Sequence, residues 1–309
     1  MRARIGRVFA GMAIAIGLAW PTDAEASEDD PALAPEPSAA GAEEEGPQHQ
    51  VMSGSLDAAF FAGRQTDADV VAVSPLLTLG MRPRPEVELG IRFGAAMMFA
   101  DHREDGELRI VRPSNLMFGT RWVRDGLEQR HRGHIGFAFA LPTNFGLEPR
   151  EKEALDYAIG VRGGLDPWQW SPTQLGIVVP GGWSWRGQWL QVGADGALAV
   201  LVAAAENPDR PGFAAQVRGH VAVASPWLLA GAALSGVVNT RDRRNMTQAS
   251  VGPFVDVPMC FGSRRRPTCP FAITAQAIVN LDEPYGFAGD GLRVWGAQAG
   301  LRWALWEPA

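Results

Sequence analysis

Residues 292–305, close to the end of the chain, constrain the fold more than any other stretch. Alternate positions carry only apolar side chains, while the positions between them hold Gln298 and Arg302 among small residues. A period of two predicts a β-strand with one apolar and one polar face. Trp295 and Trp303 mark the two ends of the apolar face, where amphipathic rings suit a boundary between membrane and water.

The same stretch resembles the closing-strand signal of bacterial outer-membrane barrels. That signal is a polar residue, a glycine two positions later and two apolar residues spaced by one, here Gln298, Gly300, Trp303 and Leu305. The chain continues to Ala309, whereas many such barrels end on an aromatic residue. The resemblance implies that outer-membrane lipid surrounds the protein and that these four residues contact the barrel assembly machinery.

The first 26 residues have the pattern of a secretory signal peptide. Arginines precede an uncharged stretch at residues 8–20, and Ala24-Glu25-Ala26 follows as a small–x–small cleavage site. An uncleaved anchor is the alternative. Residues 27–50 contain Pro, Ala, Glu and Asp, with Leu33 as the one large apolar residue, so we expect a disordered acidic leader. These features predict export, with residues 51–306 forming one domain.

Composition limits the classes of function. A net charge of −6 gives no indication of nucleic-acid binding. The 36 glycines argue against long helices. After the signal peptide, no apolar run reaches the length of a transmembrane helix, about 20 residues.

Alternating segments separated by turns continue through residues 51–306. In residues 86–99, for example, Leu89, Ile91 and Phe93 share one face, whereas Glu88 and Arg92 share the other. A soluble sandwich would also alternate, but its core would not hold these charges, whereas a water-filled lumen would. We therefore predict an all-β fold, an antiparallel up-and-down transmembrane β-barrel of about 12 strands, within a range of roughly 12 to 14.

The faces opposite the apolar ones define the predicted lumen. Residues 155–165 are included because they also alternate and are expected to form a strand. The candidate lumen-lining residues are Glu88, Arg92, Arg121, His134, Asp156, Arg162, Asp195, Arg218, His220, Gln298 and Arg302. These charges could line a pore or pair with one another and fill a narrow barrel.

Residues 116–143 carry a second resemblance. The pattern Leu-x-Phe-Gly-Thr-Arg-Trp, followed by a strand that ends in Ala-Leu-Pro-Thr, resembles outer-membrane transporters of the phenol-degradation (MetA-like) type, a group near the long-chain fatty-acid channels. The resemblance implies a passive route for small solutes, hydrophobic ones included. The polar leader is not expected to act as the inward hatch of the fatty-acid channels.

Other chemistry has weak support. The sequence lacks a Gly-x-Ser-x-Gly motif, a phosphate-binding loop and four-ligand zinc spacing. His131 and His134 have no nearby third ligand, so no metal or cofactor is expected. His134 or His220 could act as the base of a membrane hydrolase, but no serine lies on a polar face at matching depth, so an enzyme is not expected.

Cys260 and Cys269 are the two cysteines, and in an exported protein they predict a disulfide, with two free thiols as the alternative. The sequence leaves open on which side of the membrane this loop lies. The favoured function is a channel for small solutes through a lumen of mixed charge. The alternatives are a structural or partner-binding barrel without conduction and, third, an outer-membrane hydrolase.

Overall fold

The computed structural model describes residues 49–65, 68–102, 106–125, 130–204, 212–240, 247–263, 266–282 and 294–307. The expected signal peptide lies outside the described residues, as does the leader up to residue 48. The last two leader residues, His49 and Gln50, already belong to the first strand.

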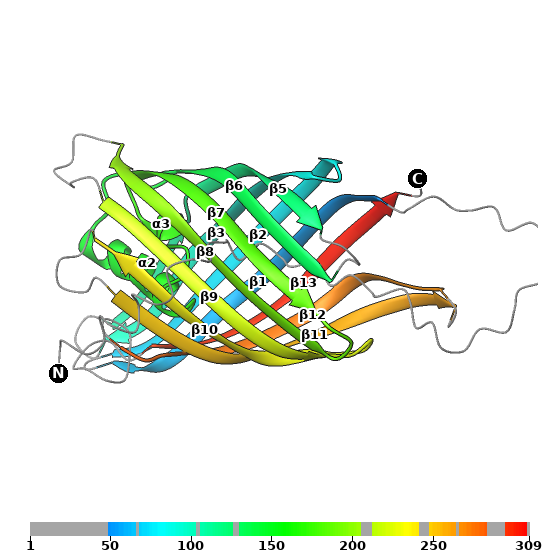
Figure 1. Cartoon of the computed structure of the whole chain (residues 1–309). Helices are drawn as coiled ribbons and strands as arrows, with labels where there is room; N and C mark the ends of the chain where they lie inside the picture. The colour runs from blue at the N-terminus through cyan, green and yellow to red at the C-terminus, as the bar shows by residue number, and fades with distance from the viewer. Residues whose placement is uncertain are drawn as a thin grey trace, which may run out of the picture.

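Thirteen strands make up one antiparallel sheet among these residues. The strands are β1 (His49–Gln65), β2 (Ala68–Arg84), β3 (Val87–His102), β4 (Gly106–Pro113), β5 (Leu116–Asp125), β6 (His131–Leu141), β7 (Gln174–Arg186), β8 (Leu190–Ala203), β9 (Gly212–Ala224), β10 (Leu229–Asn239), β11 (Thr247–Ser263), β12 (Arg266–Asn280) and β13 (Trp295–Glu307). β1 pairs with β13, and β2 pairs with β3, so the sheet closes on itself (Figure 1).

β4 and β5 together occupy one position in the ring. Both pair with β3, β4 along Ala95–His102 and β5 along Val87–Arg92. The interruption follows Pro113, which cannot donate a ladder hydrogen bond. The ring therefore has twelve strand positions, which confirms the predicted barrel, while β4 is a strand that the sequence reading missed.

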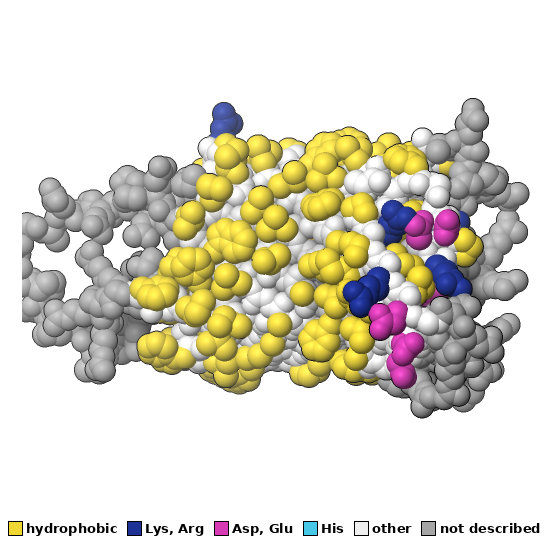
Figure 2. Space-filling model, turned by 180° about the vertical axis from the view of Figure 1, so that it is seen from behind, with side chains coloured by type: hydrophobic (Ala, Val, Ile, Leu, Met, Phe, Trp, Pro, Cys, Tyr) yellow, Lys and Arg dark blue, Asp and Glu magenta, His cyan; other side chains and the backbone are white. Residues whose placement is uncertain are grey.

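The two faces of the strands are segregated as predicted. On β3, Leu89, Ile91 and Phe93 are 41–43% exposed on the outside, whereas Glu88 and Arg92 are at most 5% exposed on the inside. Figure 2 shows the resulting apolar outer surface, with charged side chains gathered toward one end. An outer surface of this kind suits contact with acyl chains.

The connection between β6 and β7, residues 142–173, folds into the barrel, and we call it the plug. It contains α2 (Pro149–Gly160) and α3 (Pro167–Trp170), which Figure 1 shows inside one end of the barrel. The expected strand at residues 155–165 is therefore wrong. In the part of the chain that the structure describes, no helix is long and apolar enough to cross a membrane.

Local signals explain why a helix forms here. Pro149 occupies the first turn of α2, and Glu148 and Glu151 form a capping box. Gly163 and Gly164 follow the helix with φ values of +73° and +79°, which glycine adopts without steric cost. A short apolar run fits a strand and a helix alike, so these end signals decide between the two.

The plug divides the barrel interior into two zones. Side chains of α2 pack against the wall in two hydrophobic clusters. Tyr157 belongs to one cluster with Phe61 and Met98, and Leu155 belongs to the other with Leu76. Burial, and next the negative charge of Glu153, raises the pKa of the Tyr157 phenol, which keeps it protonated. The plug end is therefore packed like a protein core.

Candidate functional site

The interior beyond the plug is polar and forms the candidate site. A cavity of about 170 Å³ lies there, lined by wall residues such as Arg218, Asp256, Gln298 and Arg302. Plug residues, Asp166 among them, form part of the same lining. The site is thus a polar chamber that ends against the plug.

Polar contacts between strands that are not neighbours span this chamber. Arg302 Nη2 on β13 lies 2.6 Å from Asp256 Oδ2 on β11, so the pair reaches past β12. Arg218 Nη2 on β9 donates to Gln276 Oε1 on β12 at 2.9 Å. Contacts between strands that are not neighbours require both side chains to point inward.

A second charged group surrounds Glu88. Its Oε2 atom accepts from Arg82 Nε at 3.1 Å and from Arg121 Nη2 at 2.7 Å. Glu88 is 1% exposed, so two arginines are needed to offset the loss of water around its carboxylate. This cluster lies near the start of β3, on the far side of the chamber from the plug.

Among the described residues, three ion pairs fasten the plug to the wall. Arg112 of β4 pairs with Glu151 of α2, and the other two pairs lie deeper in the barrel. Arg92 Nη1 lies 2.6 Å from Asp166 Oδ2, and the other carboxylate oxygen of Asp166 accepts from Gln216 Nε2. Arg162 Nη2 lies 2.7 Å from Asp57 Oδ1, and its Nε donates to Ser74 Oγ. Asp166 has a left-handed backbone, with φ of 55°, a costly conformation for a residue other than glycine that surrounding contacts must hold in place.

Amide side chains add further plug contacts. Asn115, at the interruption between β4 and β5, donates to the carbonyl oxygens of Trp168 and Ser171, and its backbone N–H donates to the carbonyl of Gln169. On the opposite side, Asn280 donates to the carbonyl of Gly160. Anchors on several sides fix the position of the plug.

Most of the predicted lumen residues share the inner face of the wall. These are Glu88, Arg92, Arg121, His134, Asp195, Arg218, His220, Gln298 and Arg302. Arg162 also points into the barrel, but from the turn after α2 and not from a strand. Asp156 lies on the exposed face of α2, so its predicted place in a wall strand is wrong. Whether these residues line a solute path stays a prediction.

The sequence reading missed several chamber residues. Asp57 and Asp256 lie on inner faces of β1 and β11, and Asp166 and Gln216 hold the plug. The alternation along β1 could have indicated that Asp57 points inward, because its neighbour Ala58 points outward. Asp166 could not be predicted as a chamber residue, because residues 155–165 before it were expected to form a strand of the barrel wall.

The two histidines predicted to lie in the lumen contact different neighbours. A Cβ added at Gly182 would lie 2.7 Å from His134 Cε1 and 2.5 Å from Asp195 Oδ1, so these two side chains meet over Gly182. His220 packs edge-on against Phe254. Across the described ranges, no group of three His, Cys, Asp or Glu residues could hold a metal ion.

The predicted disulfide joins Cys260 to Cys269 across the β11–β12 hairpin. The hairpin turns at the end of the barrel where β1 begins and β13 ends, which we call the terminal end; the opposite end is the loop end. β11 and β12 extend past their neighbours at the terminal end (Figure 1). The two cysteines therefore stiffen a projecting hairpin.

Comparison with solved structures places this fold among bacterial outer-membrane barrels. The COG4313 outer membrane channel from Pseudomonas putida F1 aligns with a TM-score of 0.52 at 11% identity, covering 87% of this chain and 100% of that one. The NanC porin aligns with a TM-score of 0.49 at 9% identity, covering 82% of this chain and 100% of the porin. No protein-family model and no curated protein matches the sequence.

This chain has the fold of the bacterial outer-membrane β-barrels. Such barrels have short periplasmic turns and longer extracellular loops. Here the strands are joined at the terminal end by residues 85–86, 126–130, 187–189, 225–228 and 264–265, and at the loop end by residues 66–67, 103–105, 142–173, 204–211, 240–246 and 281–294. The loop end thus carries the longer connections, the plug among them, and the terminal end carries the disulfide.

Proposed function

We propose that this outer-membrane barrel is a passive channel for small solutes, with the plug as its constriction. The observation that carries the proposal is the polar chamber, which holds a cavity of about 170 Å³ among paired charges and ends against an inward-folded loop. A barrel with a purely structural role would not need buried charges, because their desolvation is costly.

The two zones of the interior favour amphipathic solutes. A charged group would exchange contacts with Arg218 or Arg302 in the chamber, while an apolar body would pass the aromatic and aliphatic surface of the plug. This chemistry agrees with the resemblance of residues 116–143 to phenol-degradation transporters. We therefore propose small aromatic carboxylates as the solute class.

Liposome swelling tests the proposal. Benzoate suits the assay better than phenol because almost all of it is ionised at neutral pH, whereas phenol is neutral and crosses lipid without protein. We expect proteoliposomes to admit benzoate faster than glucose, and faster than protein-free liposomes of the same lipid admit it. Equal rates for benzoate and glucose would reject the solute class.

A non-conducting structural barrel is the second candidate, and the packed plug favours it. A non-conducting barrel predicts that proteoliposomes with correctly folded protein swell no faster than protein-free liposomes in any solute. The folded state is checked by the altered electrophoretic mobility of the unheated barrel, so that misfolding is not mistaken for a closed lumen.

A further inference from the structure

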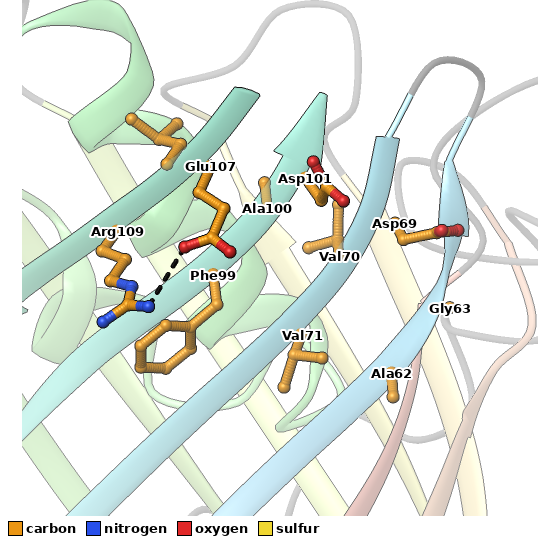
Figure 3. Close-up of a pocket in the computed structure, with 11 residues that line it drawn as sticks. Ala62, Gly63, Asp69, Val70, Val71, Phe99, Ala100, Asp101, Glu107 and Arg109 are labelled. Atoms are coloured by element: carbon orange, nitrogen blue, oxygen red, sulfur yellow. Dashed lines mark hydrogen bonds and ion pairs between the residues drawn. The ribbon is translucent and has the colours of Figure 1, made fainter. Parts of the chain in front are cut away.

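Two hollows in the described part of the barrel differ in what their arginines contact. One lies on the outer surface over β1 to β4 and is lined by Val71 and Phe99. Figure 3 shows Arg109 beside Phe99, in an ion pair of 3.1 Å with Glu107, so this arginine already has a carboxylate partner. The chamber inside the barrel, in contrast, holds an arginine without one.

Four arginines and four aspartates line the chamber cavity. Three of each are joined in ion pairs of 2.6–2.7 Å, which are Arg92 with Asp166, Arg162 with Asp57 and Arg302 with Asp256. The remaining two, Arg218 and Asp195, lie opposite each other on β9 and β8. Among the described residues, neither of them has a partner of opposite charge at ion-pair distance.

The side chain of Arg218 is turned away from Asp195. Its Nη2 atom donates to the amide oxygen of Gln276 on β12 at 2.9 Å, and Gln276 lies opposite Phe254 of β11. A neutral amide oxygen is a weaker partner for a guanidinium than a carboxylate, which accepts two parallel hydrogen bonds. The carboxylate of a solute could therefore replace Gln276 at Arg218.

Asp195 requires a hydrogen-bond donor. It is 8% exposed and lies beside His134 over Gly182, without a hydrogen bond to any described residue. A buried carboxylate without a partner is costly, and an O–H or N–H group of a solute would remove this cost. A second anionic group on the solute would instead be repelled.

An aromatic surface lies beside Arg218. Phe254 points into the cavity from β11, and its ring lies edge-on to His220 with the centroids 6.1 Å apart. His220 follows Arg218 by two residues, so both side chains leave the same face of β9. The cavity has a volume of about 170 Å³, and a cavity of about 150 Å³ is sufficient to bind benzene. One aromatic ring therefore fits.

We propose that Arg218, Phe254 and Asp195 form a binding site for one aromatic carboxylate that also carries a hydrogen-bond donor, such as a hydroxybenzoate. The carboxylate bonds to Arg218, the ring packs on Phe254 and the donor bonds to Asp195. The site rests on the proposed function, because it concerns the solutes that enter the chamber. It is narrower than that function, since it predicts a choice among aromatic carboxylates.

Isothermal titration calorimetry of the full barrel in detergent tests the site, with empty micelles as the blank. The probes are 4-hydroxybenzoate, benzoate and terephthalate, which differ only at the ring position opposite the carboxylate. We expect 4-hydroxybenzoate to bind about tenfold more tightly than benzoate, because it gains a hydrogen bond to a buried carboxylate. Terephthalate should bind most weakly, because its second carboxylate meets Asp195.

Variants assign each part of this preference to a residue. Asp195→Asn should remove most of the difference among the three probes, because it removes the negative charge. Arg218→Gln should weaken binding of 4-hydroxybenzoate about tenfold, since the charge-assisted bonds are lost, and Phe254→Leu should weaken it as well. Matched controls are Arg84→Gln, at an exposed position of the terminal end, and Phe93→Leu, on the outer face of β3. Both controls should bind like the wild type.

Binding and conduction fail separately. Binding with the expected preference, but without faster swelling of proteoliposomes, would reject the channel and support the site. Admission of benzoate by proteoliposomes, with binding unchanged in Arg218→Gln and Asp195→Asn, would support the channel and overturn the site. Equal affinities of the wild type for the three probes would overturn the site even if no variant folds.

Discussion

At the scale of single residues, Arg162 shows how the plug is held. Its guanidinium bonds to Asp57 and Ser74 of the wall and lies 5.8 Å from the ring centroid of Trp170. Both members of the ion pair are buried, with exposed fractions of 8% and 14%. Removing one partner would leave a buried charge without compensation, which costs more than the pair itself contributes.

Arg162→Ala should therefore lower the free energy of unfolding by about 3 kcal/mol. Urea unfolding of the refolded protein in detergent micelles measures this change. The double variant Arg162→Gln with Asp57→Asn removes both charges and should recover part of the loss. A single variant as stable as the wild type would show that the pair does not hold the plug.

Residue patterns also explain what the sequence could predict at this scale. Glu88, Arg92 and Arg218 were predicted to point inward because strand alternation fixes the face of each side chain. The partners of these side chains could not be predicted from the sequence. Arg92, for example, pairs with Asp166 of the plug, which lies 74 positions away in the sequence. Asp156 was misplaced because its face depended on a strand that does not exist.

At the scale of elements, period two located most strands, while connections were harder to predict. β4 was missed because Glu107, Arg109 and Arg112 made an exposed strand at the rim look like part of a charged loop. The plug was missed because residues 155–165 fit two periods. Pro149 and the pair Gly163-Gly164 were the available signals of a helix with defined ends.

β13 offers a test of the closing-strand signal. A Cβ added at Gly300 would lie 2.7 Å from Asp57 Cβ and 3.0 Å from the carbonyl oxygen of Leu56, so the wall itself requires glycine here. Gly300→Val should destabilise the refolded barrel by about 1–3 kcal/mol. Ala299→Val, on the exposed face next to it, should have little effect.

The same pair of variants separates packing from recognition by the assembly machinery, which remains a prediction for Gln298, Gly300, Trp303 and Leu305. Unfolding in vitro measures packing, and the amount of folded protein in the outer membrane measures assembly. If Gly300→Val unfolds in urea like the wild type yet fails to assemble in cells, recognition and not packing explains the glycine.

At the scale of the whole molecule, the barrel is a closed wall whose interior is filled at one end by a segment of the same chain, the plug. Ala140 of β6 pairs with Gly176 of β7, so these strands are adjacent where the plug leaves and rejoins the wall. A turn of about four residues could therefore replace residues 143–172. Arg162→Ala offers a second way to loosen the plug if the deletion variant does not fold.

Single-channel conductance in planar bilayers tests the central claim most directly, that the plug controls an otherwise continuous lumen. The account predicts small currents for the wild type, larger and steady currents for the deletion variant, and intermittent larger currents for Arg162→Ala. Equal conductance in all three folded proteins, or none in any of them, would contradict it.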